Sequence, residues 1–140
     1  MSSPRYLLDT NAISELRKKQ PDRRVLSFFS TVNSESLLLS VLSIGELHKG
    51  AAIKKLTDPE GARRLIAWID GIEQNFGNRI LPIDAANCKI WGDLSAHRSR
   101  PVIDTLIAAT AIVHDLILVT RNTRDIRDIP HLNVLNPWKD

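Results

Sequence analysis

The pattern of apolar and polar positions divides the chain into short apolar runs and longer segments with helical spacing. The short runs predict strands at residues 5–8, 36–40, 79–83, 116–120 and 132–135. Between them, apolar residues recur every three or four positions and predict helices over residues 12–17, 22–33, 43 to beyond 51, 58–77, 85–97 and 103–114. Strands and helices therefore largely alternate along the chain.

Strands that alternate with helices predict a parallel sheet covered on both faces. We therefore expect an α/β fold, an α/β/α sandwich around a central, mostly parallel sheet, built as one domain over residues 1–140. Pro82 places the strand at 79–83 at an edge or at a strand end, because proline cannot donate a ladder hydrogen bond. The segment 103–114 is rich in alanine and apolar on nearly all sides, so we expect this helix to lie buried against the sheet.

Four acidic residues occupy positions that such a sheet brings together. Asp9 and Asp125 follow apolar strands, while Glu46 and Asp104 lie in the first turns of two predicted helices. Ligands bind to open α/β sheets beyond the carboxyl ends of the strands. Carboxylates that converge there repel one another unless a hard cation neutralises them, and oxygen ligands favour Mg²⁺, with Mn²⁺ as a possible substitute. The sequence therefore predicts a divalent metal site.

Each acid also has a plainer explanation. Asp9 could cap the helix that follows it, and Glu46 could close a capping box with Ser43. Asp104 could favour the positive end of a helix dipole, and Asp125 could belong to an ordinary charged loop. Caps, however, do not have to converge on one edge of a sheet. The coincidence of four acids at such positions favours the metal site.

Composition narrows the remaining possibilities. The chain is 43% hydrophobic and 25% charged, and no stretch is apolar enough to cross a bilayer or to serve as a signal peptide, so we expect a cytoplasmic protein. The single cysteine, Cys88, excludes an intramolecular disulfide and is expected to be a small core residue rather than a catalytic thiol. The histidines lack zinc spacing, and neither a phosphate-binding glycine loop nor a serine nucleophile motif occurs.

Positive charge gathers beside the acids although the net charge is only +3. Most clusters of like charge are solvated faces. Arg98 and Arg100 come shortly before the third acid, and Arg121 and Arg124 shortly before the fourth. We expect these arginines to be able to contact the phosphates of a nucleic acid held at the acidic centre.

Five segments in a fixed order carry a further signal. They read LDTNAISEL at 8–16, SIGEL at 43–47, VIDTLIAATA at 102–111, LVTRNTRD at 118–125 and LNPW at 135–138. Together they resemble the PIN-domain ribonucleases, and among these the VapC toxins of bacterial toxin–antitoxin pairs, especially the FitB-like branch. The chain departs from that pattern in its short loop at 98–101 and in Ile126, which stands where phenylalanine commonly follows the fourth acid.

The resemblance implies roles for individual residues and partners for the chain. Asp9, Glu46 and Asp104 match the core metal ligands, and Asp125 matches the more variable fourth acid. The polar residues that the resemblance implies around the site are Thr10, Asn11, Thr120 and Asn122. It also implies a homodimer and a cognate antitoxin of the VapB or FitA type, which would cover the acidic groove and would itself provide the contact with operator DNA.

The resulting hypothesis is a magnesium-dependent endoribonuclease that acts as the toxin of a toxin–antitoxin pair and hydrolyses RNA phosphodiester bonds with a metal-activated water. One alternative is a catalytically silent PIN module that binds RNA or a protein partner. A phosphatase with Asp9 as nucleophile is disfavoured, because Asn11 and not an aspartate stands two residues further on. A surface for a protein partner, unless its residues belong to the core, is expected at Phe28, Phe29, Ile53 and Leu56.

Overall fold

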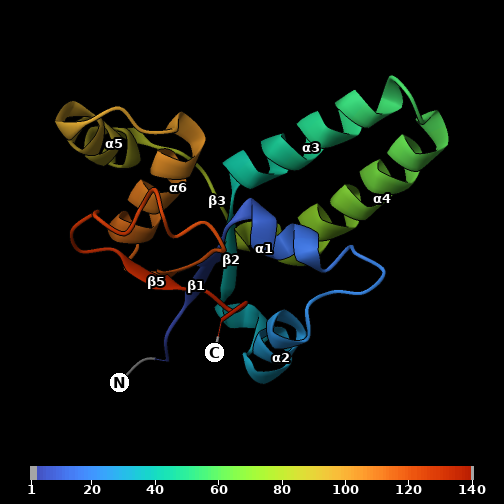
Figure 1. Cartoon of the computed structure of the whole chain (residues 1–140), viewed down its shortest axis with the longest axis horizontal. Coiled ribbons are helices and arrows are strands. Elements are labelled where there is room, and N and C mark those ends of the chain that lie inside the picture. Colours follow the sequence, from blue (N-terminus) through green and yellow to red (C-terminus); the bar gives the residue numbers. More distant parts are fainter. Residues whose placement is uncertain (1–2, 140) are drawn as a thin grey trace.

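A parallel five-stranded sheet forms the centre of the protein (Figure 1). The computed structural model describes residues 3–139, and within them every neighbouring pair of strands is parallel, in the order β3-β2-β1-β4-β5. The strands are β1 (Tyr6–Leu8), β2 (Leu37–Ser40), β3 (Ile80–Leu81), β4 (Ile117–Val119) and β5 (Asn133–Leu135). Each lies within its predicted range, and β3 is an edge strand that ends before Pro82, as predicted.

The helices agree with the sequence pattern except at two starting points. They are α1 (Thr10–Glu15), α2 (Arg23–Thr31), α3 (Val41–Lys55), α4 (Pro59–Phe76), α5 (Ala85–His97) and α6 (Val102–Val113), with the short 3₁₀ turns η1 (Ser34–Ser36) and η2 (Gly77–Arg79). Helix α1 begins directly after Asp9 rather than at residue 12. Helix α3 begins at Val41 and not at Ser43, because the Ser40 hydroxyl accepts a hydrogen bond from the amide of Leu42 and caps the helix as soon as β2 ends.

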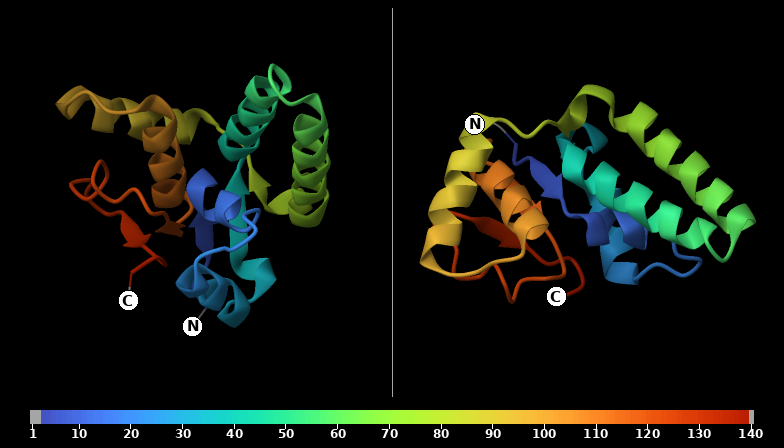
Figure 2. Two further views of the ribbon diagram at one scale, coloured as in Figure 1. Left: turned by 45° about the vertical axis from the view of Figure 1, so that its right-hand side comes forward. Right: turned by 90° about the horizontal axis from the view of Figure 1, so that it is seen from above.

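Two helical layers cover the two faces of the sheet (Figure 2). Leu7, Leu38 and Leu118 are in register on adjacent strands and belong to the core beneath α5 and α6. Their neighbours Leu8, Leu39 and Val119 belong to the opposite core, which α1 to α4 cover. Because successive side chains of a strand point to opposite faces, both faces are apolar and the strands read as continuous hydrophobic runs. The predicted α/β/α sandwich is confirmed.

Helix α6 is buried against the sheet, as its composition predicts. Ile107, Ala108, Ala109 and Ala111 are each no more than 1% exposed. The small alanine side chains allow the helix to lie close to the strands, and its first turn lies at the same edge of the sheet as the end of β1. This position brings Asp104 towards Asp9.

The prediction that Cys88 belongs to the core is wrong, because this side chain is exposed on α5. Its neighbour Asn87 is the buried residue. The Asn87 side chain accepts a hydrogen bond from the Asp84 amide at 2.9 Å and donates one to the Thr110 hydroxyl at 3.2 Å. This capping box fixes the rotation of α5 and turns Cys88 outwards.

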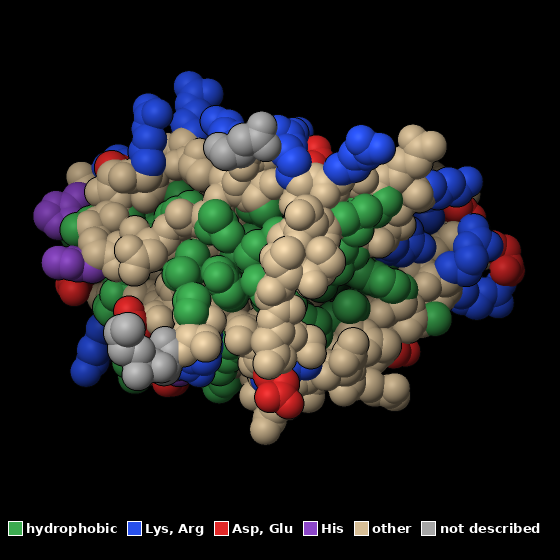
Figure 3. All heavy atoms as spheres, turned by 90° about the horizontal axis from the view of Figure 1, so that it is seen from below, with side chains coloured by type: hydrophobic (Ala, Val, Ile, Leu, Met, Phe, Trp, Pro, Cys, Tyr) green, Lys and Arg blue, Asp and Glu red, His purple; other side chains and the backbone are tan. Residues whose placement is uncertain are grey.

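Of the four residues expected to dock a partner, two belong to the core and two are exposed. Phe28 and Phe29 are partly buried and lie edge-on to one another with ring centroids 5.3 Å apart, so they contribute to the core. Ile53 and Leu56 are 57% and 83% exposed near the tip of the α3–α4 hairpin, which extends away from the sheet (Figure 1). On the face seen from below, hydrophobic side chains occupy the middle and most Lys and Arg side chains the margins (Figure 3).

Within residues 3–139, no helix is both long and apolar enough to span a membrane.

Candidate functional site

Hydrogen bonds hold Asp9 at the carboxyl end of the central strand β1. Its amide donates to the Val119 carbonyl at 2.9 Å, which extends the pairing of β1 with β4 by one residue. The carboxylate accepts hydrogen bonds from the Thr10 amide and the Thr120 hydroxyl, both at 2.7 Å. Asp9 is therefore both the N-cap of α1 and an inward-facing acid at the sheet edge. Burial raises its pKa although these hydrogen bonds lower it, and the negative charge of Glu46 raises it further.

Thr120 connects the first acid to the polar residues around it. The Thr120 hydroxyl donates to Asp9 and accepts from the Asn11 side chain at 3.2 Å and from the Asn122 amide at 3.1 Å. The Asn11 side-chain oxygen accepts from the Arg121 amide at 3.3 Å, so α1 is tied to the segment that follows β4. Thr120 is fully buried, which keeps this arrangement in place. The structure thus brings together the supporting residues that the resemblance implied.

Glu46 faces the end of β1 from the second turn of α3. The Thr10 hydroxyl donates to the Glu46 carboxylate at 2.5 Å and is 2.9 Å from the hydroxyl of Ser43. The capping box suggested for Glu46 and Ser43 is wrong. Ser40 is the N-cap of α3, so Ser43 and Glu46 both lie inside the helix and not at its start. Glu46 therefore has no role at the helix end and is available to the acidic edge.

Asp104 and Asp125 complete the group of acids on the other side of β1. Asp104 lies in the first turn of α6, and its pKa is raised first by burial and then by the negative charges of Asp9, Glu46 and Asp125. The Asn122 side-chain amide lies between the two aspartates, at 3.4 Å from Asp104 and 3.5 Å from Asp125. Four acids from distant parts of the sequence are thus close enough to repel one another.

The chemistry of this group fits a hard divalent cation. The available donors are carboxylate oxygens, and the raised pKa values of Asp9 and Asp104 mean that their negative charges are not neutralised by positive groups. Among residues 3–139, however, no three Asp, Glu, His or Cys side chains form an arrangement that could hold a metal ion as it stands. A cation held by three of these side chains at once would require the carboxylates to move towards one another, whereas Mg²⁺ can also be held by one or two carboxylates with waters as its other ligands. Asp9, Glu46 and Asp104 are the donors with the position and charge to hold such a cation.

Arg98 and Arg100 form a clamp with Asp128 that sequence reasoning did not find. The two guanidinium groups approach the Asp128 carboxylate to 3.1 Å, and both donate to the backbone carbonyl of Asp125, at 3.0 Å and 3.3 Å. The paired arginines hold the pKa of Asp128 far below its usual range. We call Arg98, Arg100 and Asp128 the arginine clamp. These hydrogen bonds give both arginines a structural role, and their contact with phosphate stays a prediction.

The other two candidate arginines lie on the segment between β4 and the fourth acid. The Arg121 guanidinium lies over the Trp138 ring, 5.4 Å from its centroid, and Arg124 is exposed. Ile126 is only 4% exposed and belongs to the core beneath α6. An aliphatic side chain therefore fills that core position, directly after Asp125.

Comparison with known proteins agrees with this geometry. The family model of the PIN domain matches residues 6–132. The chain belongs to the PIN-domain family. This PIN domain is 37% identical to "VapC ribonuclease Y4jK" of Sinorhizobium fredii, over 95% of this chain and 97% of that protein. It is 32% identical to "Toxin FitB" of Neisseria gonorrhoeae, over 96% of this chain and 99% of that protein.

Solved structures of this group share the fold. The PIN domain superposes on the crystal structure of FitAcB from Neisseria gonorrhoeae with a TM-score of 0.86 at 31% identity, covering 96% of this chain and 99% of that one. For the structure of FitAB bound to the IR36 DNA fragment, the TM-score is 0.84 at 30% identity, with 95% of each chain covered. The resemblance to PIN domains of the VapC and FitB kind is confirmed.

Proposed function

We propose that this PIN domain is a magnesium-dependent endoribonuclease that acts as the toxin of a toxin–antitoxin pair. The observation that carries the proposal is the meeting of Asp9, Glu46, Asp104 and Asp125 at the carboxyl edge of the sheet, with the pKa values of Asp9 and Asp104 raised. Similarity to proteins named VapC ribonuclease and Toxin FitB supports RNA as the substrate. The silent binding module remains the alternative.

The chain's own residues prepare the site for hydrolysis. Asp9, Glu46 and Asp104 would hold the ion, with Asp125 beside them to position the attacking water. When bound, Mg²⁺ lowers the pKa of a water and stabilises charge on the scissile phosphate and the leaving oxygen. Thr120 and Thr10 keep the first two carboxylates oriented through their hydroxyl groups. Cleavage should leave a 5′-phosphate and a 3′-hydroxyl.

The proposal includes partners. The similar structures are complexes named FitAcB and FitAB, the second with DNA, and this supports a cognate antitoxin of the VapB or FitA type for this chain. The antitoxin would cover the acidic edge and bind operator DNA, and the toxin would act in the cytoplasm as a homodimer. Ile53 and Leu56, exposed near the tip of the α3–α4 hairpin, are the candidate surface for that partner.

The test is to produce the protein alone in bacterial cells and to map new 5′-phosphate RNA ends across the transcriptome. Matched strains produce Asp104→Asn and, as a control, Asp115→Asn. Asp115 is exposed before β4, at the opposite edge of the sheet, and its positive φ of 54° is well tolerated by asparagine. New ends in the wild-type and Asp115→Asn strains alone would support the ribonuclease. Identical maps in all strains, with folded protein free of antitoxin, would favour the silent module.

A further inference from the structure

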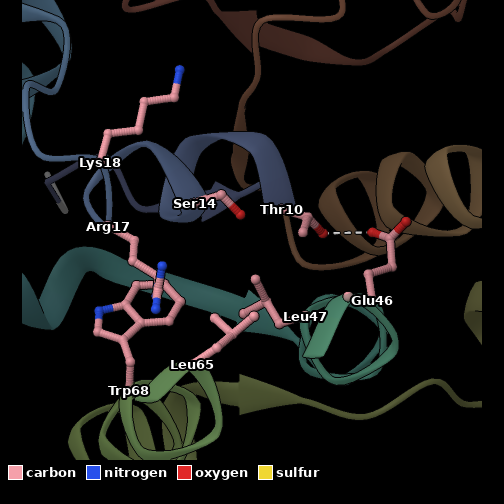
Figure 4. A pocket seen from close by; sticks show the side chains of 9 residues that line it. Thr10, Ser14, Arg17, Lys18, Glu46, Leu47, Leu65 and Trp68 are labelled. Carbon is pink, nitrogen blue, oxygen red and sulfur yellow. Dashed lines mark hydrogen bonds between the residues drawn. The ribbon is translucent and has the colours of Figure 1, made fainter. Parts of the chain in front are cut away.

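A cavity of about 360 Å³ opens directly beside Glu46 (Figure 4). Its walls come from α1 and the turn after it, from α3 and from α4. Thr10 and Glu46, which are hydrogen-bonded to each other, line the cavity and also belong to the acidic edge. Because the cavity and the acidic edge share these two residues, a molecule bound at the acids can extend directly into the cavity.

The far wall of the cavity combines an aromatic ring with a positive charge. Trp68 and Arg17 lie on the side away from Glu46, with the apolar side chain of Leu65 next to them (Figure 4). Trp68 is half-buried against the core, which holds its ring in place. Within residues 3–139, the Arg17 guanidinium makes no ion pair, whereas Lys18, which also lines the cavity, pairs with Glu15 at 2.9 Å. Arg17 is thus the cation available to a ligand.

Gly50 keeps part of the cavity wall open. It lies within α3 and lines the cavity, and a Cβ atom at this position would meet no heavy atom within 4 Å. Glycine is less favourable than alanine inside a helix, and no close contact at position 50 requires a residue without a side chain. Any larger side chain at position 50 would reduce the space between α3 and the opposite wall.

We propose that this cavity binds the nucleotide next to the scissile phosphate of the RNA, with its base against Trp68 and its phosphate at Arg17. The proposal rests on the ribonuclease function proposed above and adds a source of base selectivity. Bases stack on aromatic side chains, and arginine pairs with phosphate oxygens through several N–H groups. The hydroxyl of Ser14, which also faces the cavity, can hydrogen-bond to a base edge or to a ribose (Figure 4).

Charge favours RNA over a peptide as the occupant. A basic peptide would suit the acidic edge but would be repelled by Arg17, and an acidic peptide would have the opposite difficulty. RNA with a bound cation suits both places, because one phosphate can lie at the cation and the next at Arg17. The cavity and the acidic edge together therefore fit a polynucleotide better than a peptide of one charge sign, and a peptide that is basic at the acids and apolar in the cavity is distinguished by the antitoxin outcome of the test below.

The experiment compares wild-type protein with three cavity variants, Gly50→Leu, Trp68→Leu and Arg17→Gln, and with Gly71→Leu as a control. Gly71 is exposed on α4 outside the cavity, and a Cβ there also meets nothing within 4 Å. The probe is a pool of random-sequence RNA 20-mers with Mg²⁺, and sequencing of the 5′-phosphate products gives the rate and the base preference at each flanking position. Thermal melting confirms that each variant is folded.

We expect each cavity variant to lose about tenfold or more in kcat/KM, mainly through KM, and to lose base preference at one flanking position. Gly71→Leu should behave as wild type. Folded cavity variants with wild-type rates and preferences would overturn the proposal. So would cavity variants that cleave normally but escape a cognate antitoxin, since the cavity would then dock a protein.

A second measurement separates this proposal from the ribonuclease function. The same RNA pool is added with Ca²⁺ in place of Mg²⁺, so that a divalent cation is still present at the acids, and tryptophan fluorescence is recorded. Stacking on Trp68 should quench the emission of wild-type protein but not that of Trp68→Leu. If the wild type cleaves no RNA, the proposed function fails, and quenching that depends on Trp68, Arg17 and an open position 50 would still support the cavity as a nucleotide site. Absence of such quenching would overturn it.

Discussion

Both terminal nitrogens of Arg100 lie 3.1 Å from the carboxylate oxygens of Asp128, and the Arg100 side chain is only 4% exposed. The same guanidinium donates to the carbonyls of Leu94 and Asp125. The loop before α6 is therefore tied to the connection between β4 and β5. Because Asp104 follows that loop and Asp125 lies on that connection, the arginine clamp sets the distance between the third and fourth acids.

The clamp predicts that a residue outside the acidic group controls cleavage. Asp128→Ala removes the acceptor of both arginines, and the backbone at Asp125 loses its fixed position. We expect the variant to melt at a lower temperature and to lose about tenfold in kcat, because small displacements of catalytic groups are costly. Single-turnover cleavage with saturating Mg²⁺ measures the effect.

Asp93→Ala, which removes an exposed acid from α5, is the matched control and should leave the rate unchanged. Wild-type kcat in folded Asp128→Ala protein would mean that the clamp does not position the fourth acid.

Removal of Asp104 should have opposite effects on activity and stability. Asp104→Asn should reduce cleavage by at least about a hundredfold, as expected when a metal ligand is lost. In EDTA at neutral pH the variant should nevertheless be slightly more stable than wild type, by about 0.5 kcal/mol, because a repelled but half-exposed charge has been removed. Addition of Mg²⁺ should raise the melting temperature of wild type more than that of the variant. A variant that is less stable than wild type in EDTA would contradict this account.

The stability difference should depend on pH in a defined direction. The pKa of Asp104 is raised above 3.8 in the folded state, so the folded protein binds this proton more tightly than the unfolded chain does. Ionised Asp104 therefore costs stability at neutral pH, and this cost disappears as pH falls through the raised pKa towards 3.8. Melting in EDTA across this range should show the gap between Asp104→Asn and wild type closing on acidification.

Asp128 should behave in the opposite way over the same titration. Its pKa is lowered, so its stabilising contribution is present above 3.8 and is lost only as pH falls further. The arginine clamp should thus remain intact while Asp104 takes up its proton. A gap between Asp104→Asn and wild type that did not vary with pH would show that Asp104 is not repelled in the folded state.

Thr120 should orient the Asp9 carboxylate and oppose the rise in its pKa that burial causes. Thr120→Val keeps the shape of this fully buried side chain but leaves the Asp9 carboxylate without its 2.7 Å hydrogen bond. We expect a loss of about 1–3 kcal/mol in the free energy of unfolding at neutral pH. The Mg²⁺ concentration for half-maximal cleavage should rise by about tenfold or more, as when other partners of metal ligands are lost. Thr120→Ser retains the hydroxyl and should restore both quantities; equal defects in the two variants would argue against the hydrogen bond as the cause.

The acidic edge was predictable because local pattern fixes where strands end. An apolar run followed by an aspartate identifies a polar residue at the end of a buried strand, as at Leu8 and Asp9, and the parallel arrangement then brings such ends to one edge. The start of α3 was less predictable, because Ser40 and Ser43 are both acceptable caps. The earlier serine caps the helix since β2 ends there, and this places Glu46 in the second turn.

The clamp and the cavity could not be predicted, because both depend on contacts between distant segments. Arg98 and Asp128 are separated by 30 positions, and Thr10 and Glu46 by 36. Neither pair has a spacing that identifies it in the sequence. The prediction for Cys88 was wrong for a related reason. The rotation of α5 that exposes Cys88 depends on the capping box and on the hydrogen bond from Asn87 to Thr110 on another helix.

The register of the central strand also determines when the acidic group can come into existence. Strand β1 carries Asp9 but pairs with β4, and the Asp9 amide bonds to Val119 near the far end of the chain. A nascent polypeptide has therefore made its first acid more than a hundred residues before the strand that fixes it has been translated. Until β4 has left the ribosome, the nascent chain cannot complete the acidic edge, so the ribosome and the messenger RNA that produce the chain lie next to an incomplete site.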